Sequence, residues 1–155
     1  MIKSYIPNTV TLLNLLSGSI AIAFAFMGNL ALSAWFIGLA AVFDLLDGML
    51  ARWLDAGSAI GKELDSLADV ISFGLAPGMI LFHLMLNSFD PPFIFWKDLN
   101  LSALPAFLVP AFAALRLAMF NVDTRQKDYF IGLPTPANAL FLASLPLVIM
   151  QARDT

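Results

Sequence analysis

The sequence contains no cysteine, a single histidine and few charged residues. Without a thiol, neither a disulfide framework nor a thiolate metal site can form, so any metal would use oxygen ligands or His83. Only 12% of the residues are charged, whereas 60% are hydrophobic and the mean hydropathy is +0.85. Soluble domains contain roughly 45 to 50% apolar residues. This composition therefore predicts an integral membrane protein.

Five apolar stretches are long enough to cross a bilayer, since about 20 helical residues span about 30 Å of hydrocarbon. They cover approximately residues 9–27, 31–53, 59–86, 101–120 and 134–151. Glycine, asparagine, proline and charged residues occupy the short breaks between them. We therefore expect an all-α, polytopic membrane helix bundle, with residues 1–155 forming a single domain.

Lysine and arginine are unevenly divided between the two ends of these expected helices. Six lie on the side of the N-terminus and two on the other side: Lys3, Arg52, Lys62, Arg116, Arg125 and Lys127 against Lys97 and Arg153. Basic residues accumulate in cytoplasmic loops. The pattern predicts a cytoplasmic N-terminus, and with it a cytoplasmic position for the junction between the second and third helices.

The two largely apolar helices that meet there carry four aspartates, and a fifth, Asp55, lies in the turn between them, within DLLDGMLARWLDAGSAIGKELDSLAD at residues 44–69. An aspartate at the centre of a membrane helix costs about 2.5 to 3.5 kcal/mol on insertion scales. Residues three or four apart share a helix face, which pairs Asp44 with Asp47 and Asp65 with Asp69. A turn near Asp55 would make the helices antiparallel and bring the two pairs opposite one another.

Facing carboxylates repel one another unless a positive charge lies between them. Mg²⁺ favours carboxylate oxygens and keeps positions open for water or phosphate. Two such ions form a clamp suited to phosphoryl displacement. Gly48 and Gly61 would leave room for a flat base or sugar beside the backbone, and Arg52 could bind a phosphate. The motif thus indicates a two-metal site acting on a phosphate compound.

The pattern Asp44-x-x-Asp47-Gly48-x-x-Ala51-Arg52, then eight residues, then Gly61-x-x-x-Asp65-x-x-x-Asp69, resembles the signature of the CDP-alcohol phosphatidyltransferase family. That family moves the phosphatidyl group of a CDP-linked lipid to a small alcohol and releases CMP. By this resemblance, Asp44, Asp47, Asp65 and Asp69 would hold two Mg²⁺ or Mn²⁺ ions, and Asp69 would also act as the general base. The CDP moiety would contact Gly48, Ala51, Arg52 and Gly61.

Three further stretches resemble the phosphatidylserine synthase branch of that family: residues 6–14 (IPNTVTLLN), 66–77 (SLADVISFGLAP), and 116–121 (RLAMFN) followed by 130–136 (FIGLPTP). The branch implies CDP-diacylglycerol and L-serine as substrates, a homodimer, and the inner or plasma membrane of a prokaryote. Arg116 and Asn121 would contact the acceptor. Met119 stands where the branch usually has arginine, and the family core has one more helix than the five expected here, which predicts a C-terminally truncated chain.

Several alternatives stay open from the sequence. The acceptor could be glycerol 3-phosphate or inositol phosphate, because the family signature does not name the alcohol. A carboxylate-lined ion carrier is the alternative from another class, since carboxylates inside membranes often mark transport. Asn8 and Thr11 could contact the diphosphate, or Asn8 could cap the first helix. No nucleic acid partner is expected.

Overall fold

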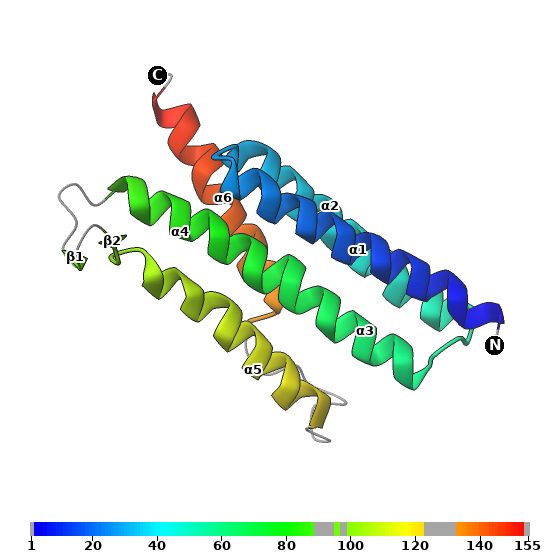
Figure 1. Cartoon of the computed structure of the whole chain (residues 1–155). Helices are drawn as coiled ribbons and strands as arrows, with labels where there is room; N and C mark the ends of the chain where they lie inside the picture. The colour runs from blue at the N-terminus through cyan, green and yellow to red at the C-terminus, as the bar shows by residue number, and fades with distance from the viewer. Residues whose placement is uncertain (1, 89–94, 97–98, 123–132, 154–155) are drawn as a thin grey trace.

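The computed structural model describes residues 2–88, 95–96, 99–122 and 133–153, and within them five helices are long and apolar enough to cross a membrane (Figure 1). The helices are α1 (Ile2–Phe26), α2 (Leu30–Trp53), α3 (Ala59–Asp69), α4 (Ala76–Ser88), α5 (Leu108–Val122) and α6 (Thr135–Arg153). A π-helix, Val70–Leu75, joins α3 and α4 into one span, and a 3₁₀ helix, Leu104–Phe107, precedes α5. Between α4 and that 3₁₀ helix, the short strands β1 (Phe95–Trp96) and β2 (Leu99–Asn100) pair antiparallel. The predicted helical membrane bundle is confirmed.

Two predicted helix boundaries are wrong. The first helix begins at Ile2 and continues through Pro7, whereas the sequence placed its start near residue 9. Pro7 is the sixth residue of α1, so the helix continues past it with one backbone hydrogen bond fewer near its start. The fourth span begins at Leu104, because the three residues from Leu101 form a turn.

Part of the predicted orientation rests on residues outside the described part of the chain. Lys97, Arg125 and Lys127 lie outside the described residues, as do residues 130–132 of the stretch that resembles the serine branch. The cytoplasmic location of the N-terminus therefore stays a prediction.

Small side chains form most of the bundle's core. Buried residues recur every three or four positions along α1, at Pro7, Thr11, Asn14, Gly18, Ala21 and Ala25. The core cluster adds further alanines from α2, α4 and α6, with Ile37, Phe73 and Ile80 as its large members. Lipid is as apolar as leucine, so membrane helices associate through close packing, which small residues permit. The α1 and α2 helices accordingly lie side by side (Figure 1).

Two turns of the same kind reverse the chain at opposite ends of α2. The backbone is left-handed at Gly28, with φ of +79°, and at Asp55, with φ of +48°. At the second turn, the Ala56 N–H donates to the Ala51 carbonyl at 2.9 Å, as in a Schellman motif. The Ser58 hydroxyl then caps α3 by accepting a hydrogen bond from the Gly61 N–H at 3.0 Å. The end of α2 is thereby fixed beside the start of α3.

The π-helix follows directly after Asp69. Its last turn closes with the Ala76 N–H donating to the Ile71 carbonyl, five residues back. Pro77 explains this widening, since proline has no N–H and its ring crowds the carbonyl four residues earlier. Gly74 and Gly78 lie against α5: a Cβ on Gly74 would stand 3.1 Å from the Ala113 Cβ. This segment therefore packs α5 closely beside the part of the chain that carries Asp69.

Candidate active site

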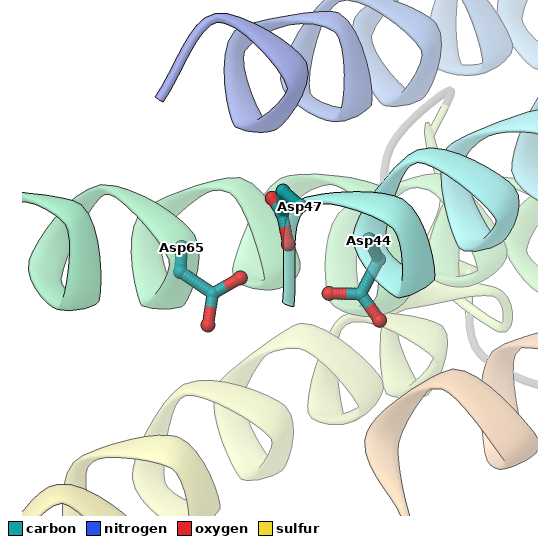
Figure 2. A group of neighbouring side chains, drawn as sticks. All are labelled: Asp44, Asp47 and Asp65. Atoms are coloured by element: carbon teal, nitrogen blue, oxygen red, sulfur yellow. The ribbon is translucent and has the colours of Figure 1, made fainter. Parts of the chain in front are cut away.

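A cluster of three carboxylates lies near the end of the bundle that holds the N-terminus. Asp44 and Asp47 project from α2, and Asp65 projects from α3 (Figure 2). One carboxylate oxygen from each lies within 4.8 Å of the other two. The reversal predicted near Asp55 thus brings residues from both aspartate pairs together.

The donor set of this cluster fits a divalent cation. Asp47 Oδ2 and Asp65 Oδ1 are buried and have no hydrogen-bond partner among the described residues. A buried polar atom without a partner costs free energy, and a buried charge without a partner costs more. Carboxylate oxygens are the ligands that Mg²⁺ and Mn²⁺ prefer. The unpaired oxygens are therefore what a cation site would require.

Asp69 lies one turn beyond Asp65 and is only 8% exposed. Its Oδ1 accepts a hydrogen bond from the Asn14 Nδ2 at 3.4 Å. Its carboxyl group also lies beside that of Asp44. Asp69 is not one of the three residues in the 4.8 Å cluster, so it stands next to the candidate cation site while keeping a contact to α1.

A first cavity of about 240 Å³ opens on one side of the cluster, between α1, α2 and the start of α3. Five residues predicted to contact the CDP moiety line it: Asn8, Thr11, Gly48, Ala51 and Gly61. A Cβ on Gly48 would meet no atom within 4 Å, so the absent side chain leaves open space. A Cβ on Gly61 would lie 2.9 Å from the Asn8 Oδ1, so this glycine permits the approach of α1.

The capping role considered for Asn8 is wrong, because α1 already begins at Ile2, six residues before it. Asn8 instead lies on the wall of the first cavity, half-buried, together with the buried Thr11. The Thr11 hydroxyl donates to the Pro7 carbonyl at 3.1 Å.

Arg52 is the one predicted CDP contact that does not line the first cavity. Its Nε donates to the Gly48 carbonyl at 3.0 Å, and the side chain is exposed beside Met49 and Trp53. A contact between this guanidinium and a phosphate in the cavity would need a different rotamer. Lys62, in contrast, lines the cavity.

A second cavity of about 400 Å³ lies on the other side of Asp65, between α3, α5 and the start of α6. Asp69, Met119 and both predicted acceptor contacts, Arg116 and Asn121, line it. The Arg116 Nη1 donates to the Thr135 Oγ1 at 2.8 Å, which ties α5 to α6.

The polar wall of the second cavity is a small hydrogen-bond network. The Asn121 Nδ2 donates to the Ser66 Oγ at 2.8 Å, and the Lys62 Nζ donates to the Asn121 carbonyl at 3.3 Å. Lys62 and Asp65 line both cavities. The carboxylate cluster therefore lies where the two cavities meet.

The sequence interpretation missed Asn14, Lys62, Ser66 and Thr135 as residues of this region. Lys62 and Ser66 could have been found, because they flank Asp65 and Asp69 at helical spacing on the same stretch. Asn14 lies three residues after Thr11 on one helical face, which was a weaker signal. Thr135 belongs to the stretch at 130–136 that resembles the serine branch, but its pairing with Arg116 depends on the contact between α5 and α6.

Comparison of the sequence with known proteins shows the family of the chain. A sequence model of CDP-alcohol phosphatidyltransferases matches residues 4–154. The chain is 39% identical over 137 residues to a Methanocaldococcus jannaschii protein named CDP-diacylglycerol–serine O-phosphatidyltransferase, covering 88% of this chain and 58% of the relative. Proteins of the same name from Bacillus subtilis and Mycobacterium leprae are 35% and 34% identical, over 92% and 94% of this chain and 75% and 48% of their own lengths.

The chain spans about half the length of the mycobacterial relatives that it matches. No solved structure matches it significantly.

Proposed function

This chain belongs to the CDP-alcohol phosphatidyltransferase family, and on that premise we propose that it transfers the phosphatidyl group of CDP-diacylglycerol to the hydroxyl of L-serine. The products would be phosphatidylserine and CMP. The observation that carries the proposal is the carboxylate cluster between two cavities, one that includes several small residues and one that includes several polar side chains.

In this proposal Asp44, Asp47 and Asp65, with Asp69 beside them, hold two Mg²⁺ or Mn²⁺ ions. Such ions, when bound, polarise a phosphate and stabilise a departing phosphate oxygen. The unpaired oxygens of Asp47 and Asp65 support this assignment, because a cation would satisfy both. The enzyme would be a multi-pass protein of a prokaryotic inner or plasma membrane, with the site facing the cytoplasm, and would form a homodimer.

The first cavity would hold the cytidine and diphosphate of the donor. Gly48 and Ala51 on α2 and Gly61 on α3 present backbone and short side chains there, which suits a flat base and a sugar. Asn8 adds an amide to the same wall. Lys62, at the junction with the second cavity, would place a positive charge near the transferred phosphate.

The second cavity would hold the acceptor. Arg116, already oriented by its hydrogen bond to Thr135, would pair with the carboxylate of serine, and Asn121 would contribute polar contacts. Asp69 would take the proton of the serine hydroxyl while the serine oxygen bonds to the phosphatidyl phosphorus. The bond between that phosphorus and the CMP oxygen breaks at the same time. A phosphorus atom at the junction would then be attacked from the second cavity and release CMP toward the first.

A second acceptor is favoured by one observation. Lys62 and Arg116 both line the second cavity, and two cations suit an acceptor that carries a phosphate, such as glycerol 3-phosphate or inositol phosphate. The two kinds of acceptor differ in negative charge, since serine has one carboxylate and a phosphate carries nearly two negative charges.

The test is CMP release from CDP-diacylglycerol by the detergent-purified protein with Mn²⁺ or Mg²⁺, comparing L-serine, glycerol 3-phosphate and inositol phosphate. We expect serine-dependent release that Asp69→Asn abolishes. Asp55→Asn is the matched control, because Asp55 is an exposed turn residue that lines neither cavity and asparagine tolerates its left-handed backbone. Release with only a phosphate acceptor would overturn the serine assignment, and metal-dependent ion flux without CMP release would favour a carrier.

A further inference from the structure

Asn14 is a polar residue in the middle of α1 that the proposed reaction leaves without a role. Its side chain is completely buried. The Nδ2 donates to Asp69 Oδ1 at 3.4 Å, while the Asn14 Oδ1 has no hydrogen-bond partner among the described residues. A half-satisfied amide inside a membrane helix is costly. Its position is therefore better explained by what it does to Asp69 than by packing.

The backbone around Asn14 is clamped to the segment that follows Asp69. The Ser72 hydroxyl donates to the Asn14 carbonyl at 3.1 Å, and both groups are buried. One turn further along α1, a Cβ on Gly18 would lie 2.6 Å from the Ser72 Cα, so only glycine allows the two segments to meet there. The close approach of Gly18 to the Ser72 backbone sets the level of Asn14 beside the π-helix, and this approach does not depend on the Ser72 hydroxyl.

Asp69 needs such a contact because it faces other acidic groups. Its carboxyl lies beside that of Asp44, and it lines the second cavity with Arg116. A carboxylate among like charges can turn away by rotation about its side-chain bonds. The amide of Asn14 binds Oδ1 of this carboxylate from the α1 side and so restrains that rotation.

We propose that Asn14 is a positioning residue that holds the Asp69 carboxylate toward the acceptor cavity. The inference rests on the proposed function, since it assigns Asn14 to the same transfer reaction. Asn14 touches neither cavity itself, so it would change turnover and leave donor binding unaltered.

The first test is the kinetics of Asn14→Leu, which keeps the number and branching of the side-chain heavy atoms and removes the amide. We expect kcat with L-serine to fall at least about tenfold, a part of the contribution of a general base. The KM for CDP-diacylglycerol should stay within about twofold of wild type, because no residue of the first cavity is altered. Asn14→Ala, which adds no volume, is measured in the same way if Asn14→Leu does not fold.

Ser72→Ala is the matched control. It removes a buried hydrogen bond to the same residue but leaves the amide of Asn14 and its contact with Asp69 in place. We expect a lower melting temperature with kcat within about twofold of wild type. An equal loss of kcat in Ser72→Ala and Asn14→Leu, or a rise in the KM for CDP-diacylglycerol that accounts for the loss, would overturn the inference.

A second readout needs no turnover. The melting temperatures of wild type, Asn14→Leu, Asp69→Ala and the double variant form a cycle, in which the two residues are coupled if the shifts do not add. Additive shifts would overturn the inference whatever the activity. If the wild-type protein releases no CMP with any acceptor, the proposed function fails, and a coupled cycle would still support the pairing of Asn14 with Asp69.

Discussion

The two cavities on either side of Asp65 are built in opposite ways. The first is formed by short side chains and glycines of α1, α2 and α3, including Gly48, Ala51 and Gly61. The second is formed by longer side chains of α3, α5 and the start of α6: apolar ones such as Met119 and Phe120, and polar ones that hold one another by hydrogen bonds. We expect the first cavity to select its ligand by shape, and the polar side chains of the second to select its ligand by charge. The donor side should therefore respond to added volume, and the acceptor side to lost charge.

The largest effect is expected where the two cavities meet. Asp65→Ala removes a carboxylate that lines both, so activity should fall about 10²- to 10³-fold or more, the range for loss of one preorganised electrostatic contact. CMP release and Mn²⁺ binding by electron paramagnetic resonance should both decline. Glu63→Gln, an exposed acid on the same helix, is the control. Undiminished Mn²⁺ binding in Asp65→Ala would contradict a cation site at the cluster.

Loss of charge in the second cavity should weaken acceptor binding alone. Arg116→Gln removes the guanidinium, and we expect the KM for L-serine to rise about 10- to 100-fold, because a hydrogen-bonded ion pair contributes about 1.5 to 3 kcal/mol. The KM for CDP-diacylglycerol should change little. Thr135→Val keeps the charge but removes the partner of the Arg116 Nη1, and it should raise the serine KM only a few-fold. Equal changes in both KM values would break the distinction between the cavities.

Added volume in the first cavity should weaken donor binding alone. Gly48→Ala places a methyl group in open space, so it should leave folding intact and raise the KM for CDP-diacylglycerol about tenfold, the scale of one methylene misfit in a binding pocket. Gly38→Ala, in the same helix and with equally open surroundings, is the matched control. A similar rise in both variants would show that helix propensity, and not the cavity, is responsible.

The smallest effect is expected in the turn between α2 and α3, which borders the first cavity. Asp55 is a non-glycine residue with left-handed backbone, which costs about 1 kcal/mol. Asp55→Gly should therefore raise the free energy of unfolding by up to about 1 kcal/mol, reduced by the greater entropy that glycine gives the unfolded chain. Thermal unfolding in detergent measures the change, and both KM values should be unaltered. A lower melting temperature would indicate that the Asp55 side chain stabilises the turn.

The difference between the cavities also explains which site residues could be placed together from the sequence. Asp44, Asp47, Gly48 and Ala51 lie on one helix and Asp65 on the next, joined by a turn whose residues are adjacent in the sequence. Helical spacing and one reversal were enough to place them together. The pairs that build the second cavity, Ser66 with Asn121 and Arg116 with Thr135, depend on how α5 and α6 pack, which no local pattern specifies.

The sequence by itself determined the membrane class, the five spans and the carboxylate cluster, because hydrophobic length and helical periodicity are local properties. Only the tertiary structure decided that α1 runs through Pro7, that Arg52 does not line the first cavity, and that the chain widens into a π-helix after Asp69. It also decided the contact between Asn14 and Asp69, two residues 55 positions apart. Such contacts depend on the close approach of whole helices, which is governed by glycines and prolines whose packing partners lie elsewhere in the chain.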